Sequence, residues 1–187
     1  MIVPIPMRKI VLWLMVLGVL LPTSCGRDKT RLRKTLARFE TVQVIVPEDM
    51  LMIQEGKQRP YQLPDSIPIL VMYVSPEECS GCRINHIMDN EDLYRWGEES
   101  GQFKLMIVIS PRPEMMERTQ EELTKSKFSI PVYLDVYSEF HDRNDIPADT
   151  RVHCFLLDGN RYPIFVGNPS ASEQLNGLFK KVLDLMD

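Results

Sequence analysis

Two cysteines separated by two residues, Cys79 and Cys82, are the side chains with the most obvious chemical potential in this 187-residue chain. Their thiols can form a reversible disulfide, and the thiolate is the nucleophile in exchange with another disulfide. The pair could instead supply part of a metal site or serve as a structural crosslink. Which of these applies depends on the elements that position the two thiols.

Acidic residues and one histidine flank the pair. Glu77 and Glu78 directly precede the first cysteine, and two negative charges disfavour a neighbouring thiolate. A less stabilised thiolate means a less stabilised reduced form, so we predict a reducing or isomerase-like couple rather than a strong oxidant. His86 follows Cys82 by four residues and is expected on the same helical face, where it could tune the dithiol electrostatically or be an ordinary surface histidine.

The segments around the pair predict a strand that leads into a helix. Ile69–Val74 is a continuous apolar run, typical of a strand that is covered on both faces at the centre of an α/β sheet. Apolar residues recur at helical spacing after Arg83, with a possible break near Asn90. Cys79 would then lie in the first turn of a helix, where unpaired backbone N–H groups and the helix dipole stabilise negative charge.

The rest of the chain predicts an alternation of strands and helices. A strand–helix–strand core must be parallel and right-handed, and a hairpin with the turn Asp158–Arg161 would extend its sheet antiparallel. A polar segment, 137–149, precedes the hairpin. Strands are expected at Thr41–Val46, Met50–Ile53, Phe103–Ile109, Ile130–Val136, Val152–Leu157 and Tyr162–Val166, and helices from the N-cap pair Ser110–Pro111 to Lys125 and from the capping box Ser170–Glu173 to Met186.

Four segments carry a family resemblance. The strand Val71–Ser75 leads to Cys79–Cys82, Phe155–Gly159 is similar to a later hairpin, and Val166–Pro169 to its closing turn. The chain thereby resembles exported, membrane-tethered thiol-disulfide oxidoreductases of the thioredoxin fold, including thioredoxin-like lipoproteins of Bacteroidetes. The resemblance implies an α/β, thioredoxin-like domain over residues 41–187, with a central mixed sheet flanked by helices and an N-terminal β extension. It also implies that Cys79 attacks first and that Cys82 resolves the mixed disulfide.

The sequence departs from that family at two positions of the expected substrate groove. Family members carry a cis-proline before the hairpin strand, and this slot is filled by Val152, where we expect a trans peptide bond because a cis bond would cost about 3 kcal/mol. Glu78 stands where thioredoxins have tryptophan. His153 and Cys154 follow the slot, and one of them should point toward the dithiol because neighbours on a strand face opposite ways. Cys154 could equally be a buried core thiol.

The N-terminus predicts export and lipidation. Arg8 and Lys9 precede an apolar run that ends at Leu21, which is too short for a membrane span and fits a signal peptide over residues 1–24. The segment resembles a bacterial lipoprotein signal, which implies lipid on Cys25. Residues 25–40 would be a basic tether, either a solvated stalk or a short amphipathic helix near lipid headgroups. We expect a cell-envelope protein anchored to the outer membrane, on its periplasmic face.

Together these features predict a thiol-disulfide oxidoreductase, tending to reduce, that acts on disulfides of exported proteins. It would draw electrons from a membrane donor and need no cofactor beyond its own disulfide. A formal net charge of −4 argues against nucleic-acid partners. Two alternatives remain: a non-catalytic binding module of the same fold, and a copper-binding assembly factor that combines the dithiol with His153. A structural zinc site is disfavoured because no second pair of this spacing exists.

Overall fold

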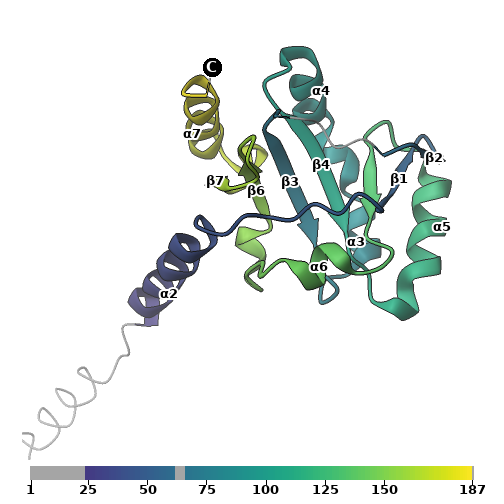
Figure 1. Ribbon diagram of the computed structural model, residues 1–187, viewed down its shortest axis with the longest axis horizontal. Coiled ribbons are helices and arrows are strands. Elements are labelled where there is room, and N and C mark those ends of the chain that lie inside the picture. Colours follow the sequence, from purple (N-terminus) through teal and green to yellow (C-terminus); the bar gives the residue numbers. More distant parts are fainter. Residues whose placement is uncertain (1–23, 62–65, 187) are drawn as a thin grey trace, which may run out of the picture. The chain divides into compact units, whose positions relative to one another are not determined.

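The computed structural model describes residues 24–61 and 66–186 (Figure 1). The chain divides into two units, Met1–Thr35 and Leu36–Asp187. The predicted signal peptide lies outside the described residues apart from Ser24, and so does the side chain of Cys25. In the described ranges, no helix combines the length and the hydropathy that a bilayer crossing requires.

The predicted tether forms a helix, α2 (Ser24–Phe39). The elements of the second unit follow it in an alternating order. They are β1 (Leu51–Gln54), β2 (Lys57–Arg59), β3 (Ile69–Val74), α3 (Ser80–Ile84), η1 (Ile87–Asn90), α4 (Glu91–Ser100), β4 (Lys104–Ile109), η2 (Pro113–Met115), α5 (Met116–Ser126), β5 (Val132–Leu134), α6 (Glu139–Arg143), η3 (Thr150–Val152), β6 (Cys154–Leu157), β7 (Pro163–Val166), η4 (Pro169–Ala171) and α7 (Glu173–Asp184).

All seven described strands form a single mixed sheet in the order β2-β1-β5-β4-β3-β6-β7. β3, β4 and β5 are parallel, with Leu70 opposite Leu105 and Val108 opposite Tyr133. The β6–β7 hairpin extends the sheet antiparallel beside β3, and the β1–β2 hairpin does the same beside β5. This confirms the predicted parallel core, the antiparallel hairpin and the N-terminal β extension. β3 lies inside the sheet between β4 and β6, and the dithiol follows its carboxyl end.

The central strands are buried on both faces, as the apolar run of β3 predicts. On one face, Leu70 and Val74 belong to a continuous apolar cluster to which α3, α4, α5 and α7 all contribute. On the other face, Phe155 meets the ring of Phe39 at 5.1 Å, and Tyr73 meets that of Phe140 at 5.3 Å. Figure 1 looks onto this second face, which is crossed by the chain after α2 and covered at its lower end by α6.

The predicted strand Thr41–Val46 is wrong, although its alternation is real. Val44 and Val46 are buried while Ile45 is exposed, as a period of two requires. The segment lies across the face of the sheet instead of pairing with its edge, so its backbone finds other partners. The Ile45 amide donates to the Asn144 Oδ1 at 2.7 Å, and the Val44 amide donates to the Arg161 carbonyl at 2.9 Å. Alternation of buried and exposed residues indicates an extended chain with one buried side. It does not indicate whether a neighbouring strand or the face of a sheet buries that side.

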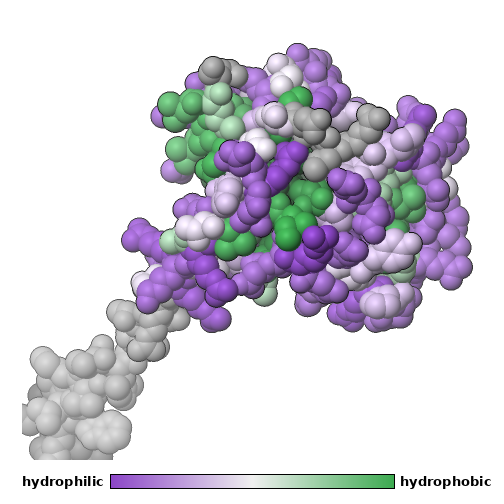
Figure 2. Space-filling view, viewed as in Figure 1, coloured by the Kyte–Doolittle hydropathy of each residue, from purple (hydrophilic) through white to green (hydrophobic). Residues whose placement is uncertain are grey.

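Two predicted helix starts are also misplaced. Ser110 does not cap a helix, because its hydroxyl is buried and donates to the Asp135 Oδ2 at 2.8 Å. The following helical turns begin only at Pro113. The last helix is capped by Ser172, whose Oγ accepts from the Leu175 amide at 3.2 Å, and not by Ser170. Figure 2 shows hydrophobic residues gathered on this helix, where Leu178 is exposed, as are Leu185 and Met186 directly after it.

Candidate active site

The dithiol lies at the turn from β3 into α3. Cys79 is the N-cap of α3, and its Sγ accepts a hydrogen bond from the Cys82 amide at 3.3 Å. The two cysteines form a disulfide, with their Cα atoms 5.3 Å apart. Both residues are exposed, so another protein can reach either sulfur. The predicted strand-to-helix position is therefore confirmed for the pair.

Helix α5 lines the outer side of the dithiol. A pocket of about 390 Å³ lies between Pro76–Gly81 and the residues Arg112, Arg118 and Glu122. A neighbouring pocket of about 430 Å³ includes both cysteines. Gly81 permits this close packing, because a Cβ at that position would lie 3.3 Å from the Glu122 Oε2. The dithiol thus borders two solvent-open hollows with charged walls.

Glu78 points inward from the same turn and does not lie free beside the thiols. Its Oε2 accepts two hydrogen bonds from the Arg83 guanidinium, at 2.9 and 2.6 Å. Its Oε1 accepts from the Ser75 amide at 3.2 Å and faces the His153 Nδ1 at 2.7 Å. The carboxylate is only 10% exposed. Burial by itself would raise the pKa of Glu78, but the hydrogen bonds from Arg83, His153 and Ser75 outweigh it and lower that pKa.

His153 comes from the end of η3 and meets Glu78 across the site. Its side chain is 5% exposed, and its ring lies 5.1 Å from the ring of Tyr73. The Nε2 faces the Pro147 carbonyl at 2.9 Å. Both ring nitrogens therefore have a partner, and the carbonyl of His153 accepts from the Tyr73 amide at 2.8 Å. Of the two residues predicted to face the dithiol, His153 is the one that contacts its turn.

The remaining predicted groove residues have less direct roles. Val152 is buried in η3, and no peptide bond within the described residues is cis, as we expected for this slot. His86 is exposed, and its Nδ1 pairs with Asp89 at 2.9 Å. Cys154 is half-buried and makes no disulfide. Burial raises the pKa of the Cys154 thiol to about 12, which keeps it protonated and unreactive at neutral pH.

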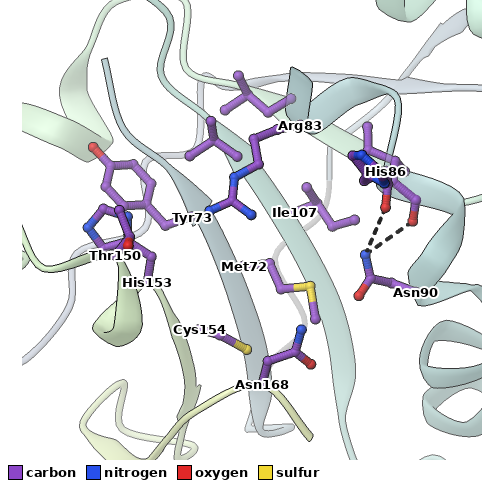
Figure 3. Close-up of a pocket in the computed structure, with 13 residues that line it drawn as sticks. Met72, Tyr73, Arg83, His86, Asn90, Ile107, Thr150, His153, Cys154 and Asn168 are labelled. Carbon is purple, nitrogen blue, oxygen red and sulfur yellow. Dashed lines mark hydrogen bonds between the residues drawn. The ribbon is translucent and has the colours of Figure 1, made fainter. Parts of the chain in front are cut away.

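A third hollow is lined by residues of β3, β4, α3 and the loop of His153 (Figure 3). It has a volume of about 170 Å³ and an apolar floor from β3 and β4, with Met72 and Ile107. Arg83 and His86 line it from the helix side, and Cys154 lines it from β6. This pocket joins the dithiol helix to the loop that carries His153.

Metal binding at the dithiol finds no support in the geometry. Both nitrogens of His153 are engaged, by Glu78 and by the Pro147 carbonyl, so neither offers a free lone pair to copper. In the part of the chain that the structure describes, no cluster of three or more potential ligands from His, Cys, Asp and Glu occurs. A copper site at the dithiol would need His153 as its third ligand.

The chain combines a parallel strand–helix–strand core, an antiparallel hairpin at the edge of the same sheet, and a dithiol directly after β3. The chain has a thioredoxin-like fold. Solved structures similar to it include an uncharacterized thioredoxin-like protein from Porphyromonas gingivalis, at 16% identity and a TM-score of 0.45, over 78% of this chain and 94% of the other. A protein from Bacteroides thetaiotaomicron, proposed to be a protein disulfide isomerase, matches at 14% identity and a TM-score of 0.47, over 78% of this chain and 89% of the other.

PrxQ from Xylella fastidiosa, solved as a variant, is also similar, at 13% identity and a TM-score of 0.47, over 71% of this chain and 89% of the other. A scan against protein-family models found no match, and a search of the curated proteins found none either.

Several site residues escape the sequence-based reasoning. Arg83 is five residues after Glu78, a spacing that brings two side chains together only because a cap and a turn intervene. Asp135 accepts from the amides of Phe140 and His141, both at 3.1 Å, and so anchors α6 within the polar segment. The signal for Asp135 was an acidic residue directly after a buried strand. Glu122 has no such signal, because only the packing of α5 brings it to the dithiol.

Proposed function

We propose that this protein is a thiol-disulfide oxidoreductase that acts on disulfides of exported proteins. The observation that carries the proposal is the exposed Cys79–Cys82 disulfide at the N-cap of a helix, directly after β3, an inner strand of a thioredoxin-like sheet. A crosslink that only stabilises a fold needs neither exposure nor this position. In this position the Cys79 thiolate can attack a substrate disulfide. Cys82, within one helical turn, can then attack the resulting mixed disulfide and release the substrate.

The reduction of a substrate proceeds in two exchanges. The Cys79 thiolate attacks one sulfur of a substrate disulfide, the substrate S–S bond breaks, and the departing thiolate takes up a proton. A mixed disulfide now joins Cys79 to the substrate. Cys82 loses its proton and attacks the Cys79 sulfur, which forms the intramolecular disulfide and releases the second substrate thiol. Two electrons have passed to the substrate, and a dithiol protein must return them to the pair before the next cycle.

Both flanking acids bear on the direction of this reaction, and they act differently. Glu77 is exposed, and hydrogen bonds from Ser75 and from its own backbone amide lower its pKa, so it stays ionised beside Cys79. Glu78 is held by Arg83 and His153, so its charge is largely compensated. An exposed, ionised acid beside Cys79 favours a moderately reducing or isomerase-like couple, with a potential between those of thioredoxin and protein disulfide isomerase, about −270 to −180 mV.

The cellular setting belongs to the same proposal and rests on the N-terminal sequence. A lipid on Cys25 would anchor the protein to the outer membrane on its periplasmic face, with a membrane dithiol protein as the electron donor. The helix α2 supports this setting, because it continues from the proposed anchor and carries the basic residues Lys29, Arg31, Arg33 and Lys34. Basic helices near a bilayer are attracted to anionic headgroups.

Insulin reduction tests the activity. Wild-type protein with dithiothreitol as electron source should precipitate the insulin B chain faster than dithiothreitol alone, and Cys79→Ser should abolish the gain. Cys154→Ala is the matched control and should retain activity, because that thiol is half-buried and protonated. Equal and negligible turnover in wild type and Cys79→Ser would favour a non-catalytic binding module.

A further inference from the structure

The cluster of Glu78, Arg83 and His153, in which Glu78 and His153 are largely buried and Arg83 reaches the surface, is the least expected feature of the site. It joins the turn before Cys79 to a loop 75 residues later, through a 2.7 Å contact. Arg83 belongs to α3, and its amide also donates to the Cys79 carbonyl at 3.1 Å. The cluster is therefore tied both to the nucleophile and to the loop that stands where family members carry a cis-proline.

The protons of this cluster can be counted from its hydrogen bonds alone. The Pro147 carbonyl can only accept, so the His153 Nε2 must carry a proton. The contact between the His153 Nδ1 and the Glu78 Oε1 requires a second proton between them, whichever atom holds it. The histidine and the carboxylate together are therefore neutral, as an imidazolium with a carboxylate or as an imidazole with a carboxylic acid. Arg83 adds one positive charge, and the three side chains carry a net charge of about +1.

This charge has the opposite sign to the one that the sequence suggests for Glu78. Charged groups from the other elements around the cluster largely pair off and do not reverse it. Arg151 binds Asp149 beside η3, while Arg112 and His141 both act on Glu77. Cys79 thus directly follows a carboxylate that is paired with Arg83 and His153, and Glu77 is the exposed acid of the same turn.

We propose that Arg83 and His153 are positioning residues that set the reactivity of Cys79, by holding the Glu78 carboxylate inward and by leaving a net positive charge behind the sulfur. The inference deepens the proposed function, on which its biological meaning rests. It assigns to His153 the role of fixing the dithiol turn against the loop of Val152. It also explains why an acid is tolerated directly before the nucleophile.

The test measures Cys79 directly and needs no substrate. In the full chain carrying Cys82→Ser, the rate of Cys79 alkylation by iodoacetamide at pH 6 reports the thiolate fraction, read by peptide mass. Arg83→Gln and His153→Gln each lower the cluster charge by one, and each should slow alkylation about tenfold, the effect of roughly one pKa unit from a single nearby charge. Arg83→Lys keeps the charge and should restore most of the rate.

His86→Gln is the matched control, since it removes an exposed histidine that pairs with Asp89, and it should leave the rate unchanged. In chains with both cysteines, the Arg83→Gln and His153→Gln potentials should fall by about 30 mV, which corresponds to a tenfold change for two electrons. Rates within twofold of wild type in both variants, with folding intact by circular dichroism, would overturn the proposal. So would faster alkylation. If the alkylation rates change as expected but the wild-type protein does not reduce insulin, the result counts against the proposed function and not against this inference.

Discussion

The stability of the protein should depend only modestly on the oxidation state of Cys79 and Cys82. The disulfide closes a loop with a sequence separation of 3, and both ends lie within one turn of chain. A crosslink that stabilises mainly by restricting the unfolded chain gains less when its loop is shorter. For this loop the chain-entropy relation gives about 2 kcal/mol at 25 °C, against about 4.7 kcal/mol for a loop of 100 residues.

The same difference reports the direction of the redox reaction. Folding and reduction form a thermodynamic cycle. If the oxidised form has the larger unfolding free energy, the native disulfide has a lower reduction potential than the unfolded one, and the native dithiol is the stronger reductant. A difference of about 2 kcal/mol corresponds to about 40 mV for two electrons. We therefore expect the oxidised protein to be more stable than the reduced protein by between zero and about 2 kcal/mol.

Urea unfolding followed by tryptophan fluorescence, with and without tris(2-carboxyethyl)phosphine, measures this difference. The Cys79→Ala/Cys82→Ala variant is the control, and its transition should not respond to the reductant. A reduced form that is more stable than the oxidised form by over 1 kcal/mol would indicate an oxidant and refute the reasoning. A loss above about 4 kcal/mol on reduction would show that the disulfide holds the structure together and would favour the crosslink reading.

Two further predictions concern the core and the Glu78 cluster. Phe179 is fully buried between the rings of Trp96, Phe103 and Phe165, so Phe179→Ala should lower the unfolding free energy by about 3–5 kcal/mol, whereas Leu178→Ala on the exposed side should cost under about 1 kcal/mol; similar losses in urea melts would contradict this packing. The lowered pKa of Glu78 contributes stability that is present above its unfolded value, near 4.5, and is lost as the pH falls through its folded pKa. Urea midpoints from pH 3 to 7 should therefore fall less steeply on acidification in Glu78→Gln than in wild type, and parallel curves would argue against the cluster.

Much of the fold could be predicted because its signals are local. The apolar run of β3, the helical spacing after Leu175 and the turn Asp158–Arg161 each depend on neighbours within a few residues, and the structure confirms all three elements. The topology followed from the handedness and parallel pairing that a strand–helix–strand unit imposes. The predicted position of Cys79 at the start of a helix needed only the strand before it and the helix after it.

The errors arose where distant segments meet. The valines before Pro47 predicted a strand, but a sheet edge and a sheet face bury alternate residues in the same way. Ser110 has the composition of an N-cap and is instead a buried donor to Asp135, because β5 lies beside β4. In both cases the local pattern was compatible with several partners, and the packing selected one.

The pair of thiols and their place after the central strand were therefore determined by the sequence, since spacing and hydrophobic pattern suffice for both. The electrostatics of that pair were decided by the tertiary structure alone. In the sequence Glu78 directly precedes Cys79, which suggests a negative charge beside the thiol. In the folded chain the same carboxylate turns inward. There it makes three hydrogen bonds, two with Arg83 and one with His153, which it could not make if it pointed into solvent. A contact across 75 residues holds this carboxylate against His153, and no local pattern records it.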